Sequence, residues 1–506
     1  LYAQDSWKAK SNLTISLGLR WEPYIAQRYI RDQFNYFDMD AFLRGERTSK
    51  FRNAPAGIFY PGDPQFPAGG NSSMPIKNQW NKWAPRVGFV WNPAGDGKTV
   101  IRSAYGVFYE TQAAEHWIAV GQGPPWAGKA LVQGTSFDDP YRNFPGGNPF
   151  PFVADVNAPY PQSGVFAFAF PDTTPPWVHQ WNLGIQRQIA TDWLVSASYI
   201  GNRVVHIYGA RELNPGVFIP GAGNSAGLCT TTVRGQTVSV RVNPGAACST
   251  TANLISRRVL SLLDTDGSRQ AAKYGSMEAW DDTGMRSYNG MLLSLNKRMS
   301  GVFSATANYT WSHCIGHPAN NLLQATAGGQ VFNDANNKDR DRGNCGAQDI
   351  RHNVNATGII RMPRFSRPWV QRLAGNWRAS GIFKGRSGDH LQPIVSADRS
   401  LTGSNPGQQR ADVVSSGYYG NKCKSDLRTA NPTCRWLNTN AFGTPALGTL
   451  GTAGPGILVG PGEWTLDAGL SRTFEIGESQ RVEFRAEANN IFNHTNLNNP
   501  SAALGA

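Results

Sequence analysis

The chain has 506 residues, of which only 16% are Asp, Glu, Lys or Arg, whereas Gly (55), Phe (24), Trp (16) and Tyr (16) are abundant. An ordinary soluble domain carries about 25% charged residues, so the composition argues against a soluble α-helical protein. No run of about 18 apolar residues occurs, which excludes a protein that crosses a membrane with helices. One membrane class remains, the β-barrel, whose lipid face uses only every second residue.

Apolar residues alternate with small or polar ones in segments spread along the chain. A period of two indicates a strand with two different faces. The segments are about 9 to 12 residues long, which suits a tilted strand that crosses a bilayer. In chain order the apolar positions are Leu13, Ile15, Leu17, Leu19 and Trp21; Trp181, Leu183 and Ile185; Trp193, Val195, Ala197 and Tyr199; Met291, Leu293 and Leu295; Phe303, Ala305, Ala307, Tyr309 and Trp311; Trp464, Leu466, Ala468 and Leu470; and Val482, Phe484, Ala486 and Ala488.

The connections between these segments alternate between short and long. Short turns join these segments and further ones, such as 1–8, 87–91 and 100–109, into six hairpins, which predicts about twelve strands. The turns lie between 8 and 13, at 92–98, 190–192, 299–301 and 476–479, and, slightly longer, at 362–372. Short turns at one end and long loops at the other are typical of an antiparallel outer-membrane β-barrel, with periplasmic turns and extracellular loops. Between the hairpins the predicted loops cover roughly residues 25–82, 111–176, 202–285, 313–348 and 386–462, with a tail after Phe492.

A soluble β-sandwich or propeller is the alternative fold. Such folds seldom place several connections longer than about 35 residues at one end. Tryptophans also favour the barrel, because they lie at or near strand ends, where an interfacial girdle would place them. These residues are Trp7, Trp21, Trp91, Trp181, Trp193, Trp311 and Trp464.

Six cysteines all fall in or at the start of the long loops, two in each of three loops. Their connectivity cannot be deduced from sequence, but pairing of neighbours within one loop is the simplest closure. Disulfides require an oxidising compartment, in agreement with exported loops. The expected pairs are Cys229 with Cys248, Cys314 with Cys345, and Cys423 with Cys434.

Two metal sites compete with these interpretations. His313, Cys314, His317 and Cys345 have the ligand types that suit zinc, but no CxxC or second paired-ligand motif accompanies them. The run 334–343 has enough side-chain oxygens for calcium, although its spacing does not fit an EF-hand and basic residues are interleaved. We therefore favour the disulfide over zinc, assign no metal or cofactor, and leave calcium binding at 334–341 open.

Two short motifs suggest catalysis or nucleotide binding. Residues 223–227 match G-x-S-x-G, but they lie in a glycine-rich loop rather than between a strand and a helix. Gly97, Lys98 and Thr99 resemble the end of a phosphate-binding loop, yet Asn92 stands where the first glycine belongs. Neither motif supports an enzyme, and we expect no catalytic residues.

The net charge is +13, which in a soluble protein would suggest nucleic-acid binding. Arg and Lys occur singly near strand ends and in loops, so they form no groove that could follow a phosphate backbone. On a barrel they could contact lipid phosphates or line a lumen that favours anionic solutes. We expect no nucleic-acid partner.

Five stretches resemble the barrel of TonB-dependent receptors of the Oar-like type, which carry a carboxypeptidase-regulatory-like domain. They are residues 1–8, 12–22, 288–298, 307–312 and 481–496, which read LYAQDSWK, NLTISLGLRWE, YNGMLLSLNKR, ANYTWS and RVEFRAEANNIFNHTN. The resemblance covers essentially the whole chain. It is specific for the family, though not for a ligand.

The resemblance implies a barrel of about 22 strands that follows a regulatory-like domain and a plug with a TonB box. We therefore expect residues 1–506 to be a partial barrel domain, in which the remaining strands and the plug lie outside this sequence. The implied function is uptake of an unidentified ligand across the outer membrane, with outer-membrane lipid, lipopolysaccharide and TonB as partners. The alternative is a surface structural or adhesion protein that transports nothing.

Overall fold

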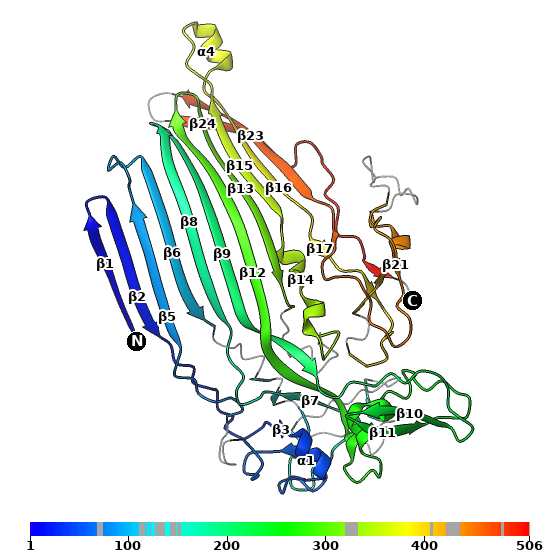
Figure 1. Ribbon diagram of the computed structural model, residues 1–506. Helices are drawn as coiled ribbons and strands as arrows, with labels where there is room; N and C mark the ends of the chain where they lie inside the picture. The colour runs from blue at the N-terminus through cyan, green and yellow to red at the C-terminus, as the bar shows by residue number, and fades with distance from the viewer. Residues whose placement is uncertain are drawn as a thin grey trace.

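A computed structural model shows an open, curved β-sheet with short turns at one end and a layer of long connections at the other (Figure 1). No helix in the described part of the chain is long and apolar enough to cross a membrane. The structure describes residues 1–67, 74–110, 117–118, 120–121, 123–126, 137–141, 148, 153–318, 332–404, 408–420, 436–476 and 480–504.

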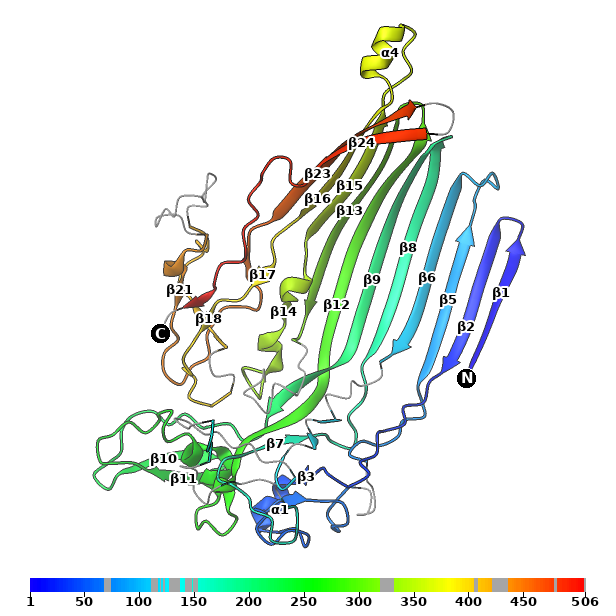
Figure 2. The same cartoon turned by 180° about the vertical axis from the view of Figure 1, so that it is seen from behind.

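Twelve antiparallel strands form the sheet, and their spatial order follows the chain. Consecutive strands pair in six hairpins joined by short turns, which confirms the predicted all-β architecture and strand count. Figure 2 shows the same sheet from behind. The strands are β1 (Tyr2–Lys10), β2 (Leu13–Trp21), β5 (Trp83–Trp91), β6 (Thr99–Tyr109), β8 (Trp177–Ala190), β9 (Trp193–Glu212), β12 (Tyr274–Ser300), β13 (Phe303–Gly316), β15 (His352–Arg361), β16 (Trp377–Arg386), β23 (Glu463–Ile476) and β24 (Gln480–Ala488).

Shorter elements occupy the connections. Strand β7 (Gly164–Phe168) pairs in parallel with β12, and β14 (Gly343–Asn344) pairs with β13. The others are β3 (Tyr36–Phe37), β4 (Ile58–Phe59), β10 (Leu228–Val233), β11 (Gln236–Arg241), β17 (His390–Leu391), β18 (Ile394–Val395), β19 (Gln409–Arg410), β20 (Asp412–Val413), β21 (Phe442–Gly443), β22 (Leu458–Val459), β25 (Ala503–Leu504), and the helices α1 (Met39–Arg44), α3 (Val259–Leu263) and α4 (Pro368–Ala374).

The register aligns the alternating apolar residues of neighbouring strands on one face, which we call the apolar face. One row of directly opposed residues crosses the sheet almost without a polar side chain. None of the described residues forms a layer over this face, since Leu17 is 54% exposed, Leu183 46% and Phe484 52%. The row consists of Leu13, Trp91, Ile101, Ile185, Ala197, Leu293, Tyr309, Val354, Gly385 and Trp464.

The opposite face of the sheet is polar. On β24, Arg485 lies 3.4 Å from Glu483 and 3.6 Å from Glu487, while Phe484 points to the apolar face. A row one residue removed from the apolar row has polar side chains across seven strands. These are Gln186, Ser196, Ser294, Asn308, Asn355, Lys384 and Thr465.

Tryptophans border the apolar face at both ends of the strands. On β5, Trp83 and Trp91 are separated by eight residues, or about 26 Å along the strand. This span matches the apolar band of a membrane barrel with its two aromatic girdles. The rim near the long connections carries Trp21, Trp83, Trp311 and Trp464, and the rim near the short turns carries Trp7, Trp91, Trp193 and Trp377.

Strands β9 and β12 continue far past their predicted ends. Their pairing runs to Glu212 opposite Glu278, so the connection covers 213–273 rather than 202–285. The apolar alternation stops near residue 200 because the extension no longer faces lipid. Its residues Ala210 and Trp280 are buried against the connections instead.

Two other connections also differ from simple loops. The turn predicted at 362–372 contains the helix α4, which projects beyond the turn end of the sheet (Figure 1). The tail after Phe492 folds back, and its strand β25 pairs in parallel with β18.

Strands β1 and β24 are the two ends of the strand order, and among the described residues neither has a further partner. Each therefore presents a row of unpaired backbone groups. Such an edge is not tolerated in hydrocarbon, because water is not present there to satisfy it. The sheet is thus open at both edges in the part of the chain that the structure describes.

A charge on the apolar face should destabilise the sheet. We expect Leu293→Lys to lower the free energy of unfolding in lipid by about 2–4 kcal/mol, because an ammonium near the bilayer midplane loses its hydration. Ser294→Lys, one residue along on the polar face, is the matched control and should cost less than about 1 kcal/mol. Urea titration in lipid vesicles measures both, and equal costs would contradict the assignment of faces.

Candidate functional site

The long connections are packed together into one body, which we call the loop layer. It comprises the described residues within 25–82, 111–176, 213–273, 317–351 and 387–462 (Figure 1). Its largest buried cluster combines Phe42 and Tyr60 of the first connection with Phe166 of the second and Leu260 of the third. The last connection contains a separate cluster that includes Phe442.

Arginine side chains link connections that are distant in sequence. Arg269 donates to the carbonyl oxygen of Leu43 at 2.9 Å. Arg257, which is fully buried, donates to the carbonyls of Val217 at 2.6 Å and Leu401 at 3.0 Å. Each bond joins one connection to another or closes a connection on itself, so the loop layer behaves as one packed unit.

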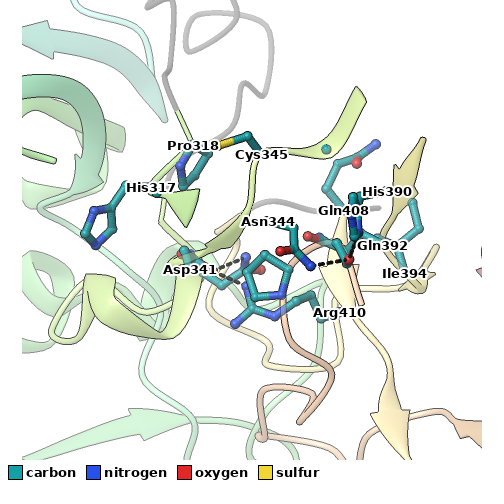
Figure 3. A pocket seen from close by; sticks show the side chains of 15 residues that line it. His317, Pro318, Asp341, Asn344, Cys345, His390, Gln392, Ile394, Gln408 and Arg410 are labelled. Atoms are coloured by element: carbon teal, nitrogen blue, oxygen red, sulfur yellow. Dashed lines mark hydrogen bonds and ion pairs between the residues drawn. The ribbon is translucent and has the colours of Figure 1, made fainter. Parts of the chain in front are cut away.

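A polar cavity of about 340 Å³ lies in the loop layer at the ends of β13 and β16 (Figure 3). Its walls come from two connections, which follow β13 and β16. Imidazole, amide and backbone groups line it together with the apolar side chains of Pro318, Ile394 and Pro455, and the charged side chains in it already have partners. The side chains include His317, Asn333, Asp341, Asn344, His390, Gln392, Gln408 and Arg410.

An ion pair between Asp341 and Arg410 forms one wall of the cavity. Both side chains are almost fully buried, at 3% and 4% exposure, and the guanidinium donates directly to the carboxylate. Arg410 also donates to the carbonyl oxygen of Arg340 at 2.9 Å, and Asn333 donates to Asp341 at 2.9 Å. These bonds offset the desolvation of the two charges, and they join the connection after β13 to the connection after β16.

A second buried carboxylate, Asp349, stands beside the cavity. It accepts from the backbone N–H of Cys314 at 2.9 Å and lies 2.9 Å from His313 and 3.2 Å from His390. The other ring nitrogen of His390 lies 2.7 Å from the carbonyl oxygen of Gly456. Both ring nitrogens of His390 thus lie against hydrogen-bond acceptors from other parts of the loop layer.

The structure does not bring the zinc-type residues together as ligands. Cys314 is bonded to Cys345, His313 contacts Asp349, and His317 contacts Asp339 at 3.1 Å. In the part of the chain that the structure describes, no three His, Cys, Asp or Glu residues are grouped to hold a metal ion.

The carboxylates of the calcium-type run 334–343 each have protein partners. Asp341 pairs with Arg410, Asp339 pairs with His317, and Asp334 accepts from the backbone N–H of Asn336 at 2.9 Å. The side chains diverge instead of converging on one point.

The two catalytic-type motifs lie in turns. In 223–227, the Asn224 side chain accepts from the N–H groups of Ala226 and Leu228, and the strand β10 follows the motif instead of a helix. Gly97 and Lys98 belong to the turn between β5 and β6, where Gly97 has a φ of 73°. Glycine adopts such a positive φ without a steric penalty, which explains its presence at this position of the turn.

The structure joins two of the three expected cysteine pairs. Both bonds lie in the loop layer or at its border with β13. They are Cys229–Cys248, with Cα atoms 5.6 Å apart, and Cys314–Cys345, with Cα atoms 5.5 Å apart, whereas Cys423 and Cys434 lie outside the described residues.

Two buried glutamates face each other across the extensions of β9 and β12, outside the membrane-spanning part of the sheet. Glu212 and Glu278 are each 3% exposed, and one carboxylate oxygen of Glu278 has no hydrogen-bond partner. Burial, reinforced by the neighbouring Glu212 charge, raises the pKa of Glu278 to about 8. Arg258, 3.7 Å from Glu212, moderates the rise in the pKa of that residue.

Asp349, His390, Arg410 and Glu278 gave no signal in the sequence. Each is an isolated polar residue whose partners are distant in the chain or lie on another strand. Arg410 is 69 residues from Asp341, for example. Of their partners, only Asp341 lay in a candidate site of the sequence, the calcium-type run 334–343.

The family profile described as "Outer membrane beta barrel domain" matches residues 1–506. The chain belongs to this family. The exposed apolar face of the sheet agrees with membership in this family. The protein is an outer-membrane β-barrel protein. No curated protein matches the chain.

Solved structures similar to this barrel protein include three transport proteins. The outer membrane transporter YddB from Escherichia coli has a TM-score of 0.39, 8% identity and coverage of 96% of this chain and 40% of its own. The ferric-catecholate import receptor Fiu from K12 E. coli has a TM-score of 0.38 and 10% identity, and the match covers 100% of this chain and 41% of Fiu. The FrpB iron transporter from Neisseria meningitidis has a TM-score of 0.37 and 10% identity, and the match covers 97% of this chain and 40% of FrpB. The chain thus spans about two fifths of these proteins.

Removal of one partner of the buried ion pair should open the loop layer of this barrel protein. We expect Arg410→Leu to lower the local opening free energy around residues 332–349 by about 3–5 kcal/mol, because Asp341 is left charged and unpaired. Hydrogen exchange of these backbone amides measures the change. Arg410→Leu with Asp341→Leu should recover most of it, and a double variant as unstable as the single one would contradict the explanation.

The loop layer should also lose stability as the pH rises. The folded pKa of Glu278 is about 8 against 4.5 for the free side chain, so the folded state binds the extra proton between these values. The stabilisation of the folded state by protonated Glu278 is full below about pH 4.5. It is lost as the pH rises through 8, at up to about 1.4 kcal/mol per pH unit. Hydrogen exchange of 274–280 between pH 5 and 8 should show this slope, and Glu278→Gln should reduce it. An unchanged slope would contradict the assignment.

Proposed function

We propose that this barrel protein is part of a TonB-dependent receptor of the Oar-like type, which takes up an unidentified ligand across the outer membrane. The observation that carries the proposal is the polar cavity in the loop layer, because a preformed cavity with converging hydrogen-bonding groups at the mouth of a membrane wall is suited to capture a solute. The five sequence stretches that resemble this family add support.

The cavity binds rather than catalyses in this proposal. Its charged members are paired with one another, as in Asp341 with Arg410, which leaves the amides of Gln392 and Gln408 to contact a ligand. The described lining residues do not include a nucleophile next to a general base, which an acyl or phosphoryl transfer enzyme needs. The ligand would be held while a plug domain, remodelled by TonB, opens a path along the polar face.

The proposal includes an orientation and a closed wall. The short turns face the periplasm, and the loop layer faces the cell exterior, where lipopolysaccharide surrounds it. Further strands pair with the free edges of β1 and β24 and close the barrel. Residues 1–506 are then one partial barrel domain of the complete receptor.

Uptake by cells tests this function. Cells with the complete gene should deplete one or more solutes from the medium, as measured by mass spectrometry of spent medium, and cells that lack either the gene or TonB should not. Gln392→Ala should weaken the depletion at low solute concentration, whereas Val414→Ala, an exposed position of the loop layer away from the cavity lining, should not. Unchanged depletion together with lost surface attachment would favour the adhesion alternative.

The disulfide pairing is a further prediction. Peptide mapping of the unreduced protein should recover Cys229 with Cys248, Cys314 with Cys345, and Cys423 with Cys434. Reduction should lower the protease resistance of the loop layer and leave the strands intact, because the first two bonds close connections and do not cross the membrane-spanning part of the wall. Cross-pairing between the connections would contradict the prediction.

A further inference from the structure

The turn between β15 and β16 is the most basic exposed turn at this end of the sheet. It carries the helix α4, in which no residue is buried. From Arg361 to Arg378 the sequence contains five arginines and no Asp or Glu, and it reads RMPRFSRPWVQRLAGNWR. Large apolar side chains in it are exposed as well, with Trp369 at 62% and Leu373 at 70%.

The end of α4 is bound to the apolar face of the sheet. The indole of Trp377 donates to the carbonyl oxygen of Leu373 at 3.0 Å, and Arg472 donates to the same oxygen at 3.2 Å and to the carbonyl oxygen of Arg372. Trp377 and Arg472 are opposite each other in the register and stand on the apolar face, since Trp377 contacts Phe484 there. These bonds place the helix at the lipid-facing rim of the wall instead of its polar side.

The adjoining rim has the same mixed chemistry. The guanidinium of Arg472 lies 4.7 Å from the ring of Phe474, and the ammonium of Lys297 lies 4.3 Å from the ring of Phe303. Cations over aromatic rings at the edge of an apolar band are typical of the headgroup level of a bilayer. The helix α4 lies just beyond this level (Figures 1 and 2).

We propose that α4 is a membrane-surface anchor, in which Arg364, Arg367 and Arg372 bind the phosphates of anionic phospholipids while Trp369 and Leu373 enter the acyl boundary. A basic segment with exposed aromatic and aliphatic side chains is suited to such an interface, where burial and charge act together. The positive charge of the segment matches an anionic lipid surface, and its apolar side chains match the acyl boundary, which an acidic soluble protein does not offer. The leaflet is periplasmic if the proposed orientation holds.

A fluorophore at the helix tests the contact in the protein reconstituted into vesicles. The probe NBD is attached at Leu373→Cys, because the side chain there is 70% exposed and the hydrogen bonds go to the backbone carbonyl oxygen. The matched control is Ala94→Cys in the short turn between β5 and β6, which lies at the same end and has no helix. The vesicles consist of phosphatidylcholine with or without about 30% phosphatidylglycerol. Doxyl-labelled lipid reports contact with acyl chains, and iodide reports contact with water.

In phosphatidylglycerol vesicles, the probe at 373 should be quenched by doxyl lipid at least about twofold more than the probe at 94. The variant R364Q/R367Q/R372Q, or removal of phosphatidylglycerol, should abolish this difference while circular dichroism still shows the folded sheet. Equal iodide quenching at the two positions would overturn the proposal. So would doxyl-lipid quenching that stays the same without phosphatidylglycerol or without the arginines. Protection of the probe from iodide only after addition of periplasmic extract would also overturn it. Loss of uptake with intact lipid contact would affect the transport proposal alone.

Discussion

The absence of water in the bilayer core is the constraint on which the rest of the structure depends. Every backbone N–H and C=O in hydrocarbon must find a partner in the protein, and paired strands achieve this between neighbours. Once the strands are paired, their side chains alternate between the two faces, so one face can be apolar while the other stays polar. The long register between β9 and β12 shows how far this pairing extends, from Trp193 opposite Lys297 to Glu212 opposite Glu278.

The same pairing builds the loop layer. Beyond the membrane, β9 and β12 continue as a ribbon whose buried residues, such as Trp280, form a floor for connections that could not bury a core by themselves. Arginines and carboxylates then fix these connections to one another in a water-poor interior. Buried charges such as Asp341 and Arg410 confer little net stability, but an unpaired one is costly, so they select one arrangement of the connections. The polar cavity is a consequence of that arrangement.

The fold was predictable because its signal is local. Alternation at Leu13 to Trp21 identifies a strand without knowledge of its partners, and the short turns identify the hairpins. The extension of β9 and β12 was missed because its side chains face protein, and the alternation specific to lipid is lost there. The cavity was missed because Asp349 meets His313 and His390 only after folding, at separations that leave no pattern in the chain. The cysteine pairs that the structure describes were inferred correctly as neighbours, since each pair closes one connection.

A spin-label scan along β12 tests the central claim that alternate side chains contact lipid. Cysteines labelled one at a time from Met291 to Asn296, in the protein reconstituted in vesicles, report their collisions with oxygen, which concentrates in hydrocarbon, and with a water-soluble nickel chelate. The account predicts oxygen maxima at 291, 293 and 295 and nickel maxima at 292, 294 and 296. Equal accessibility at neighbouring positions, or a maximum every three to four residues, would contradict it.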